Sequence, residues 1–162
     1  NLIGDPSWES LEKNLSSLAK TILKKNIKFT HAVGILSGGA FITKYLVKKI
    51  NVKKYYYLNL KKYGISRGYI NRINNYLFSK HVQVRKNGLT KANFEPSDKV
   101  LIIDDQSMSG STLKKAIEIV VDKGVPIKNV FTCVISKASS KFEPDFYFQD
   151  CLQLSFPWGC DA

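Results

Sequence analysis

Apolar positions along the chain alternate between helical spacing and short continuous runs. Residues 7–25 place apolar side chains at helical intervals and predict an amphipathic helix. We expect one side of that helix to carry Trp8, Leu11, Leu15, Leu18, Ile22 and Leu23. Residues 32–36 form the continuous apolar run of a buried strand, residues 37–39 predict a tight turn, and residues 41–50 predict a second helix.

The second half of the chain repeats this alternation of strand and helix. Residues 55–60, 100–104 and 130–136 predict strands, with 100–104 at the centre of the sheet. The helix after the central strand is expected to bury a face formed by Leu113, Ala116, Ile117 and Val120. Short closing strands are expected at 146–147 and 152–156. Strands that alternate with helices predict an α/β fold, a Rossmann-like parallel sheet flanked by helices.

Length and composition favour a single domain that spans residues 1–162. No internal repeat or low-complexity linker divides the chain, and its hydrophobic content of 44% is enough for a buried core. No apolar run reaches the roughly 20 residues of a membrane span and no signal peptide is visible, so we expect no membrane association. Cys133, Cys151 and Cys160 are odd in number and lack metal-binding spacing, which indicates free thiols in the cytoplasm.

Basic residues outnumber acidic ones by an unusual margin. The formal net charge is +12, from 25 Lys and Arg against 13 Asp and Glu. Such a charge attracts polyanions, including nucleic acid, although a Lys-rich surface without that role has the same composition. The basic residues of segment 61–95 are interleaved with Tyr63, Tyr69 and Tyr76, and only 80–85 looks like a strand. This segment is either an element that contacts phosphates and bases or a mobile surface excursion.

The residues with the clearest chemistry follow the predicted central strand. That buried strand ends in two adjacent acids, Asp104 and Asp105, which can hold a polyol or, through water, a metal ion. The loop after them is made of small and hydroxyl-bearing residues, and it opens the next helix. Backbone N–H groups at a helix N-terminus, together with the helix dipole, suit a phosphate group. This stretch therefore predicts a sugar-phosphate site.

Three segments, in the same order along the chain, resemble the type I phosphoribosyltransferase family. Residues 101–112 resemble the family's motif for 5-phosphoribosyl-1-pyrophosphate (PRPP), in which an apolar strand and two acids precede Thr-Gly-x-Thr. Residues 33–39, about 70 residues upstream, look like its pyrophosphate loop. Residues 144–147 and 156–158 look like the C-terminal hood of the purine members, the hypoxanthine, xanthine and guanine enzymes.

The resemblance implies transfer of a phosphoribosyl group from PRPP to a nucleobase, with a purine as the expected acceptor and Mg²⁺ as cofactor. Asp104 and Asp105 would be the catalytic pair, holding the ribose hydroxyls and Mg²⁺ directly or through water. The implied PRPP-binding residues are Ser37, Gly38, Gly39, Ser107, Met108, Ser109, Gly110, Ser111 and Thr112. Residues 141–162 would form the hood, in which Lys141, Phe156 and Trp158 would contact the nucleobase. A homodimer is expected by analogy with the fold.

The chain departs from the family pattern at four positions. Met108 stands where purine members carry an acid that exchanges a proton with the base, and a thioether cannot do so. Ser37 replaces a Lys or Arg before the two glycines, and Gln153 falls where an aromatic residue usually stacks on the base. Glu143 takes the place of a base-reading Lys, with Lys141 two residues away.

Two alternatives to the enzyme therefore stay open. The first is a module of the same fold with reduced catalysis, which binds PRPP, a nucleotide or nucleic acid as a sensor or regulator. The second is an unrelated α/β domain in which Asp104 or Asp105 accepts a phosphoryl group. This last hypothesis leaves the Gly38-Gly39 loop and the hood motif unexplained.

Overall fold

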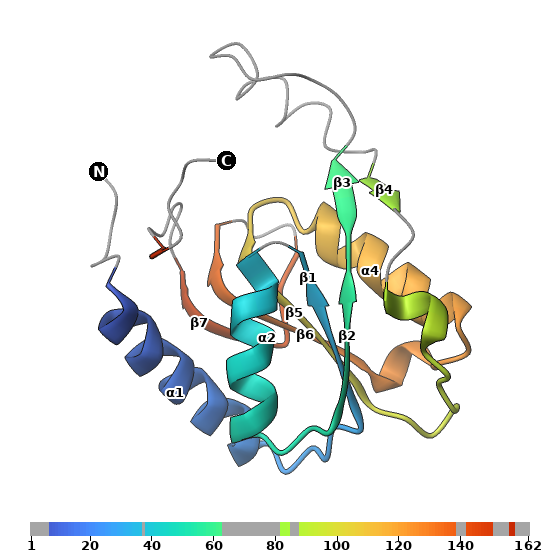
Figure 1. Ribbon diagram of the computed structural model, residues 1–162, viewed down its shortest axis with the longest axis horizontal. Coiled ribbons are helices and arrows are strands. Elements are labelled where there is room, and N and C mark those ends of the chain that lie inside the picture. The colour runs from blue at the N-terminus through green and yellow to red at the C-terminus, as the bar shows by residue number, and fades with distance from the viewer. Residues whose placement is uncertain are drawn as a thin grey trace.

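A five-stranded parallel sheet forms the centre of the molecule (Figure 1). The computed structural model describes residues 7–36, 38–62, 82–84, 88–138, 142–150 and 156–157. The strands are arranged in the order β2-β1-β5-β6-β7, and every neighbouring pair is parallel. Their bounds are β1 (His31–Ile35), β2 (Lys54–Leu58), β5 (Val100–Ser107), β6 (Val130–Lys137) and β7 (Phe146–Asp150). The predicted parallel α/β sheet is confirmed, and so is the central place of the strand that begins at Val100.

Helices cover both faces of this sheet (Figure 1). Helices α1 (Trp8–Lys24) and α2 (Gly38–Lys49) pack on one face, and their apolar side chains join Leu101, Ile103 and Ile135 in one core cluster. Helix α4 (Ser111–Asp122) packs on the other face, in a second cluster with Ile102 and Val134. Because β1 and most of β5 are buried from both sides, their continuous apolar runs match the strand pattern of a covered parallel sheet.

Helix α1 has its N-terminus capped by Ser7, whose Oγ accepts a hydrogen bond from the Ser10 N–H at 3.1 Å. Its buried residues are Leu11, Leu15, Leu18, Ala19 and Ile22. The prediction that Trp8 and Leu23 share this buried side is wrong, since they are 57% and 51% exposed. Leu23 follows Ile22 by one position, a rotation of about 100° that carries it off the apolar stripe. Trp8 instead contacts the ring of Phe41 on α2, with centroids 5.9 Å apart.

The strand predicted at 55–60 is divided in two. The chain pairs with β1 as far as Leu58, and then β3 (Leu60–Lys62) pairs antiparallel with β4 (Val82–Val84) in a separate two-stranded sheet. Strand β4 confirms the strand expected within 80–85. Residues 63–81 and 85–87 of segment 61–95 lie outside the described residues, as do residues 152–155 of the last predicted strand. Short 3₁₀ turns η1 (Gly88–Lys91) and η2 (Ile127–Asn129) complete the described elements.

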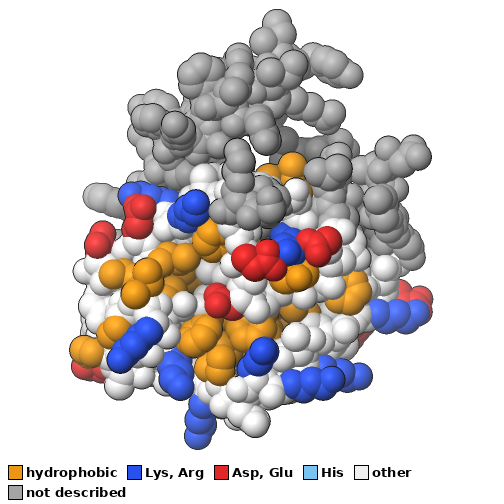
Figure 2. Space-filling view, turned by 180° about the vertical axis from the view of Figure 1, so that it is seen from behind, with side chains coloured by type: hydrophobic (Ala, Val, Ile, Leu, Met, Phe, Trp, Pro, Cys, Tyr) orange, Lys and Arg blue, Asp and Glu red, His pale blue; other side chains and the backbone are white. Residues whose placement is uncertain are grey.

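Charged side chains are scattered over the face of the molecule opposite to the view of Figure 1. Figure 2 shows Lys and Arg side chains spread around the edges of that face, with Asp and Glu and apolar groups between them.

None of the helices in the described part of the chain is long and apolar enough to cross a membrane. Cys133, the cysteine that the described residues include, is buried in β6, and burial raises the pKa of its thiol.

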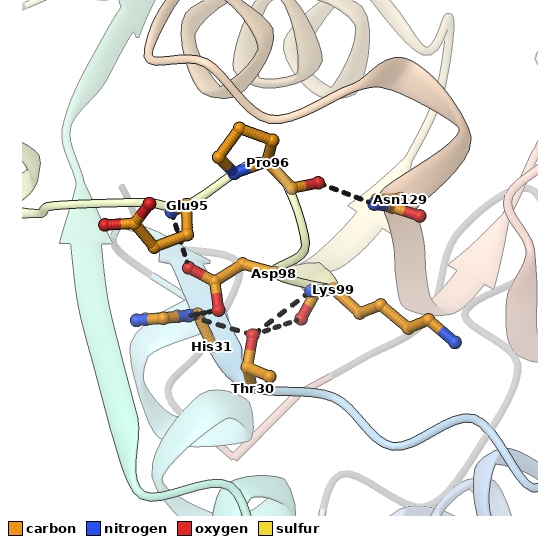
Figure 3. A network of polar contacts seen from close by, with 7 residues as sticks. All are labelled: Thr30, His31, Glu95, Pro96, Asp98, Lys99 and Asn129. Carbon is orange, nitrogen blue, oxygen red and sulfur yellow. Dashed lines mark hydrogen bonds and ion pairs between the residues drawn. The ribbon is translucent and has the colours of Figure 1, made fainter.

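A polar network joins the amino ends of β1 and β5 (Figure 3). His31 is 2% exposed, and its Nδ1 lies 3.0 Å from Thr30 Oγ1 and 3.4 Å from Asp98 Oδ1. Thr30 Oγ1 also accepts from the Lys99 N–H, and Asp98 Oδ2 accepts from the Glu95 N–H at 2.8 Å. Burial lowers the pKa of His31, against the attraction of Asp98. The neutral imidazole therefore holds the end of the sheet opposite to the cavity described next.

Candidate active site

Two adjacent carboxylates lie in the carboxyl half of the central strand β5, which continues past the predicted end at 104 as far as Ser107. Asp104 is 7% exposed, and its Oδ1 accepts a hydrogen bond from the Asp105 N–H at 2.9 Å. Asp105 is half-buried, and its Oδ1 accepts from the Gln106 N–H at 2.8 Å. Because each carboxylate accepts from the backbone N–H of the next residue, the pair has a defined orientation near the carboxyl end of β5.

A cavity of about 290 Å³ opens at this carboxyl edge of the sheet. Its walls come from the ends of β1, β3 and β5 and from the first turns of α2 and α4. The residues that line it are Ile35, Leu36, Gly38, Leu60, Asp104, Asp105, Gln106, Met108 and Thr112. Open parallel α/β sheets bind their ligands at this edge, outside the carboxyl ends of the strands. The carboxylates and the apolar walls therefore face one ligand-sized space.

The loop that follows the carboxylates leads into α4. Gly110 has φ +74°, and a Cβ at this position would overlap the side chain of Phe142. Both observations require glycine here. The hydroxyls of Ser109 and Ser111 lie 3.0 Å apart, and no side-chain hydrogen bond caps α4 at Gly110. Thr112, in the first turn, lines the cavity. Ser109 Oγ accepts a hydrogen bond from the Ser111 N–H at 3.4 Å, and a helix N-terminus offers further backbone N–H donors to an anion.

The first turn of α2 lies directly against the two carboxylates. A Cβ on Gly38 would overlap the carboxylate of Asp105, and a Cβ on Gly39 would lie 2.8 Å from the backbone oxygen of Ile103. The predicted tight turn at 37–39 is therefore wrong for the two glycines, which are helical and buried. Their lack of a side chain lets α2 approach the end of β5. This contact between helix and strand places Gly38 and Gly39 beside Asp104 and Asp105.

Several predicted site residues are not placed at the cavity. Ser37, Lys141 and Trp158 lie outside the described residues, as does Gln153. Phe156 is 8% exposed and packs in the core cluster of α1 and α2. The predicted PRPP-binding residues Gly39, Ser107, Ser109, Gly110 and Ser111 adjoin the cavity in sequence but are not among its lining residues. Their roles in ligand binding stay predictions.

The charged cluster around Lys137 was not predicted from the sequence. Lys137 ends β6 beside Ser107, and its Nζ lies 2.6 Å from both carboxylate oxygens of Glu143. The same Nζ lies 3.2 Å from Asp150 Oδ1 and 4.2 Å from the ring centre of Tyr147. The bond to Glu143, more than the other contacts, raises the pKa of Lys137. Glu143, which departs from the family pattern, thus serves as the partner of a cation from the neighbouring strand.

Gln106 is a second residue to which the sequence assigned no role. It lies between the acids and the loop, and it is one of the residues that line the cavity. A polar residue within an otherwise apolar and acidic strand was the available signal. Leu36 and Leu60 were not predicted either, because their place at the cavity depends on where β1 ends and where β3 begins.

The carboxylate pair fits magnesium better than a permanently held metal. The described residues contain no group of three or more His, Cys, Asp or Glu side chains that could enclose a metal ion. Mg²⁺ prefers oxygen ligands, keeps several waters, and is commonly held by one or two carboxylates together with substrate oxygens. Asp104 and Asp105 supply oxygen ligands of this kind at the cavity. The donor set therefore matches a magnesium ion that arrives with a phosphorylated ligand.

The parallel sheet and its flanking helices define an α/β protein with the type I phosphoribosyltransferase fold. Residues 7–162 match the family model of the phosphoribosyl transferase domain, so the chain belongs to that family. No curated protein sequence matches it.

Solved structures of phosphoribosyltransferases share this fold at low sequence identity. A purine phosphoribosyltransferase from Pyrococcus horikoshii is similar with a TM-score of 0.70 and 18% identity, over 96% of this chain and 93% of that one. A xanthine-guanine-hypoxanthine phosphoribosyltransferase from Helicobacter pylori has a TM-score of 0.70 and 19% identity, over 96% and 92%. A hypothetical protein from Neisseria gonorrhoeae with bound ppGpp has a TM-score of 0.70 and 15% identity, over 96% and 87%.

Proposed function

We propose that this protein transfers the 5-phosphoribosyl group of PRPP to a purine base and releases pyrophosphate. The observation that carries the proposal is the convergence of Asp104, Asp105 and the first turns of α2 and α4 on one cavity. Each part matches one part of PRPP: carboxylates suit ribose hydroxyls, and two helix N-termini suit two phosphate-bearing ends. Family membership supports the same assignment.

Catalysis in this proposal depends on position and charge. The N-terminus of α4 and the hydroxyls of Ser109, Ser111 and Thr112 bind the 5-phosphate, while Asp104 and Asp105 hold the ribose hydroxyls. The bond between C1 and pyrophosphate breaks as a base nitrogen approaches, and the sugar acquires positive charge in the transition state. Fixed carboxylates favour that positive charge, and the N-terminus of α2 favours the negative charge on the leaving pyrophosphate.

Mg²⁺ is the proposed cofactor, held by Asp104 and Asp105 through water or substrate oxygens. When bound, it neutralises charge on the pyrophosphate. The orientation of the two carboxylates by the backbone N–H groups of Asp105 and Gln106 would persist with or without the ion, because those hydrogen bonds use protein groups alone.

Met108 leaves the cavity without a carboxylate at the position where purine members exchange a proton with the base. Its side chain is 46% exposed and lines the cavity, and its thioether can neither take nor give a proton. We propose that water at the open side of the cavity accepts the proton from the base nitrogen. Met108→Asp introduces a carboxylate at this place, and should raise the rate most for bases whose reacting nitrogen carries a proton.

The test is pyrophosphate release from PRPP with Mg²⁺ and a panel of hypoxanthine, xanthine, guanine, adenine and uracil. The proposal expects turnover with a purine, and loss of at least about 100-fold in Asp105→Asn, since the carboxylate acts on transition-state charge. Asp122→Asn is the matched control, because Asp122 is exposed at the far end of α4. Absence of turnover with every base, in protein that binds PRPP, contradicts the enzyme.

A second candidate is a sensor of the same fold that binds PRPP or a nucleotide without turnover. Met108 in place of an acid favours it, as does the structural similarity to a protein with bound ppGpp. Calorimetry with PRPP, purine nucleotides and ppGpp separates the two candidates when combined with the turnover assay. The scattered Lys and Arg side chains of Figure 2 give no continuous track for nucleic acid on that face of the described chain.

A further inference from the structure

Lysines gather at the amino edge of the sheet, the edge opposite to the cavity. Strands β2, β1, β5 and β6 are neighbours there, and their first residues pair in register across the sheet. Each of these strands begins with a lysine or follows one within three residues. Three strand spacings of about 4.8 Å give this lysine row a length of about 14 Å. The row consists of Lys53 and Lys54 at β2, Lys28 before β1, Lys99 before β5 and Lys128 before β6.

Further lysines lie where α1, α2 and α4 end, near the same edge: Lys24, Lys25, Lys48, Lys49 and Lys123. Figure 2 shows Lys and Arg side chains along the lower margin of the molecule, the side on which β1 and β2 begin in Figure 1. The acidic residues of the described chain near this edge are Glu95, Asp98, Asp122 and Asp145. The carboxylates of Asp98 and Asp145 already accept backbone N–H groups. The amino edge therefore carries an excess of positive charge.

Helix ends explain only part of this charge. A lysine in the last turn of a helix interacts favourably with the helix dipole, which accounts for Lys24, Lys48 and Lys49. The lysine row comes instead from strand starts and from the connections before them. Among the described residues, no ion pair joins a lysine of the row to a carboxylate. Figure 3 shows the side chain of Lys99 extending away from Thr30 and Asp98. Such a concentration of like charge attracts a polyanion.

An exposed aromatic ring stands at one end of the lysine row. Tyr55 follows Lys54 on β2, which is an edge strand, and it is 41% exposed. Its ring makes an edge contact with that of Tyr57, with centroids 5.9 Å apart. Proteins that bind single-stranded nucleic acid combine cations for the phosphates with aromatic rings on which bases stack. A duplex keeps its bases inside, so the exposed ring favours a single strand.

A membrane surface fits this edge less well. Lipid binding by a basic surface needs a continuous apolar face beside the lysines. The other large apolar side chains exposed at this edge are Leu23, in the last turn of α1, and Ile127, in η2. They are isolated from each other, because α1 packs on one face of the sheet and η2 follows α4 on the other. A row of cations with a ring at its end matches a linear polyanion.

We propose that the amino edge of the sheet binds single-stranded nucleic acid, with phosphates on the lysine row and a base stacked on Tyr55. The row matches about four consecutive phosphates of a stacked strand, at about 3.4 Å of rise each. The cavity lies at the carboxyl edge, so this surface is separate from the site of the proposed reaction. The inference goes beyond the proposed function and does not depend on it.

The experiment measures fluorescence anisotropy of a labelled 12-nucleotide oligouridylate at several salt concentrations. The edge variant Lys28→Gln/Lys53→Gln/Lys128→Gln removes three exposed lysines. Lys54 is kept, because it pairs in register with His31 and lies beside that residue's network. The matched control is Lys13→Gln/Lys44→Gln/Lys91→Gln, which makes the same change in net charge at exposed lysines of α1, α2 and η1, away from this edge.

The edge variant should bind the oligonucleotide at least about 10-fold more weakly than wild type near 50 mM salt. The slope of log affinity against log salt should fall in magnitude by about 2, since each phosphate contact of a single strand contributes about 0.7. The control should stay within about 3-fold of wild type and keep its slope. Tyr55→Ala should weaken binding by about 5-fold or more without a change of slope, because the lost ring carries no charge.

Melting temperatures of all three variants should stay close to that of wild type, so that weaker binding is not a loss of folding. Absence of oligonucleotide binding by folded wild-type protein near 50 mM salt overturns the proposal. So does an equal loss in the edge variant and the control, because net charge alone would then determine affinity. Unchanged binding by Tyr55→Ala refutes the stacked base. Tighter binding to vesicles that contain phosphatidylserine than to the oligonucleotide, lost in the edge variant, replaces the nucleic acid by a membrane.

Discussion

Replacing each glycine of the α2 N-terminus by alanine should separate function from stability. In Gly38→Ala, the new Cβ overlaps the carboxylate of Asp105, with Cγ only 2.5 Å away. A carboxylate is the movable end of a side chain, so Asp105 can turn aside. To reach ordinary contact near 3.4 Å, Cγ must move by roughly 0.9 Å. Misplacement of a reacting group by about 1 Å costs on the order of 100-fold in rate.

Gly39→Ala meets the backbone instead. Its Cβ would lie 2.8 Å from the Ile103 oxygen and 3.3 Å from the Asp104 Cα, and neither atom can move without distorting β5. Overpacking of this kind costs about 1–3 kcal/mol. For Gly38→Ala, the preference of alanine over glycine in helices, up to about 1 kcal/mol, offsets the small cost of turning one side chain. We therefore expect Gly38→Ala to keep its stability and Gly39→Ala to lose it.

Urea unfolding and pyrophosphate release on both variants test this contrast. The expected result is a free energy of unfolding within about 1 kcal/mol of wild type for Gly38→Ala, with kcat/KM reduced about 100-fold. Asp105→Asn in the Gly38→Ala background should add little, because the carboxylate is already displaced. Wild-type kcat/KM in Gly38→Ala would refute the claim that the position of Asp105 limits the reaction.

Three further substitutions test other parts of the fold. Gly110→Ala should lower the free energy of unfolding by at least about 1–2 kcal/mol from its left-handed backbone alone. Phe142→Gly in the same chain removes the Cβ that the new methyl group would meet, and should recover the part of the loss that comes from this overlap, as urea titration would show. The lowered pKa of His31 means that the folded state resists protonation of this ring, so its contribution to the free energy of unfolding is complete above about pH 6.5 and is lost as the pH falls below that value. His31→Gln should reduce the loss of unfolding free energy between about pH 7 and 5. An unchanged slope of unfolding free energy against pH would contradict this role of His31. Lys137→Met leaves Glu143 without its cation and should lower the melting temperature more at pH 7 than near pH 4, where carboxylates are partly protonated. An equal drop in melting temperature at both pH values would refute a contribution of this ion pair to stability.

Local pattern was enough to predict the sheet. Strand β5 and its neighbours are continuous apolar runs because both faces are covered, and this property is visible in each segment alone. The break at Asn59 was not predicted, because a single polar residue before Leu60 does not by itself end a strand, whereas here the pairing partner changes from β1 to β4. Strand ends depend on partners that the sequence does not reveal.

The candidate site shows the same division. Asp104, Asp105 and the loop before α4 were predictable because their chemistry lies in one contiguous segment. Gly38 and Gly39 were predicted as a turn, since glycine favours turns locally, whereas here tertiary packing against β5 requires them. The cluster of Lys137 depends on strand register and on a loop that returns to β6, and neither follows from spacing.

The two ends of the sheet differ in how their carboxylates are placed. At the amino end, Asp98 accepts a hydrogen bond from the Glu95 N–H and lies 3.4 Å from Nδ1 of His31, whose ring packs against Phe94 at 5.1 Å and whose Nε2 has no partner in the described part of the chain. At the carboxyl end, the adjacent carboxylates of Asp104 and Asp105 both line one cavity, so like charges meet there. Departures from good local packing and pairing are expected where ligands bind, because the ligand supplies the missing partners. A bound ligand should therefore stabilise this end in particular, and stabilising substitutions there should cost function.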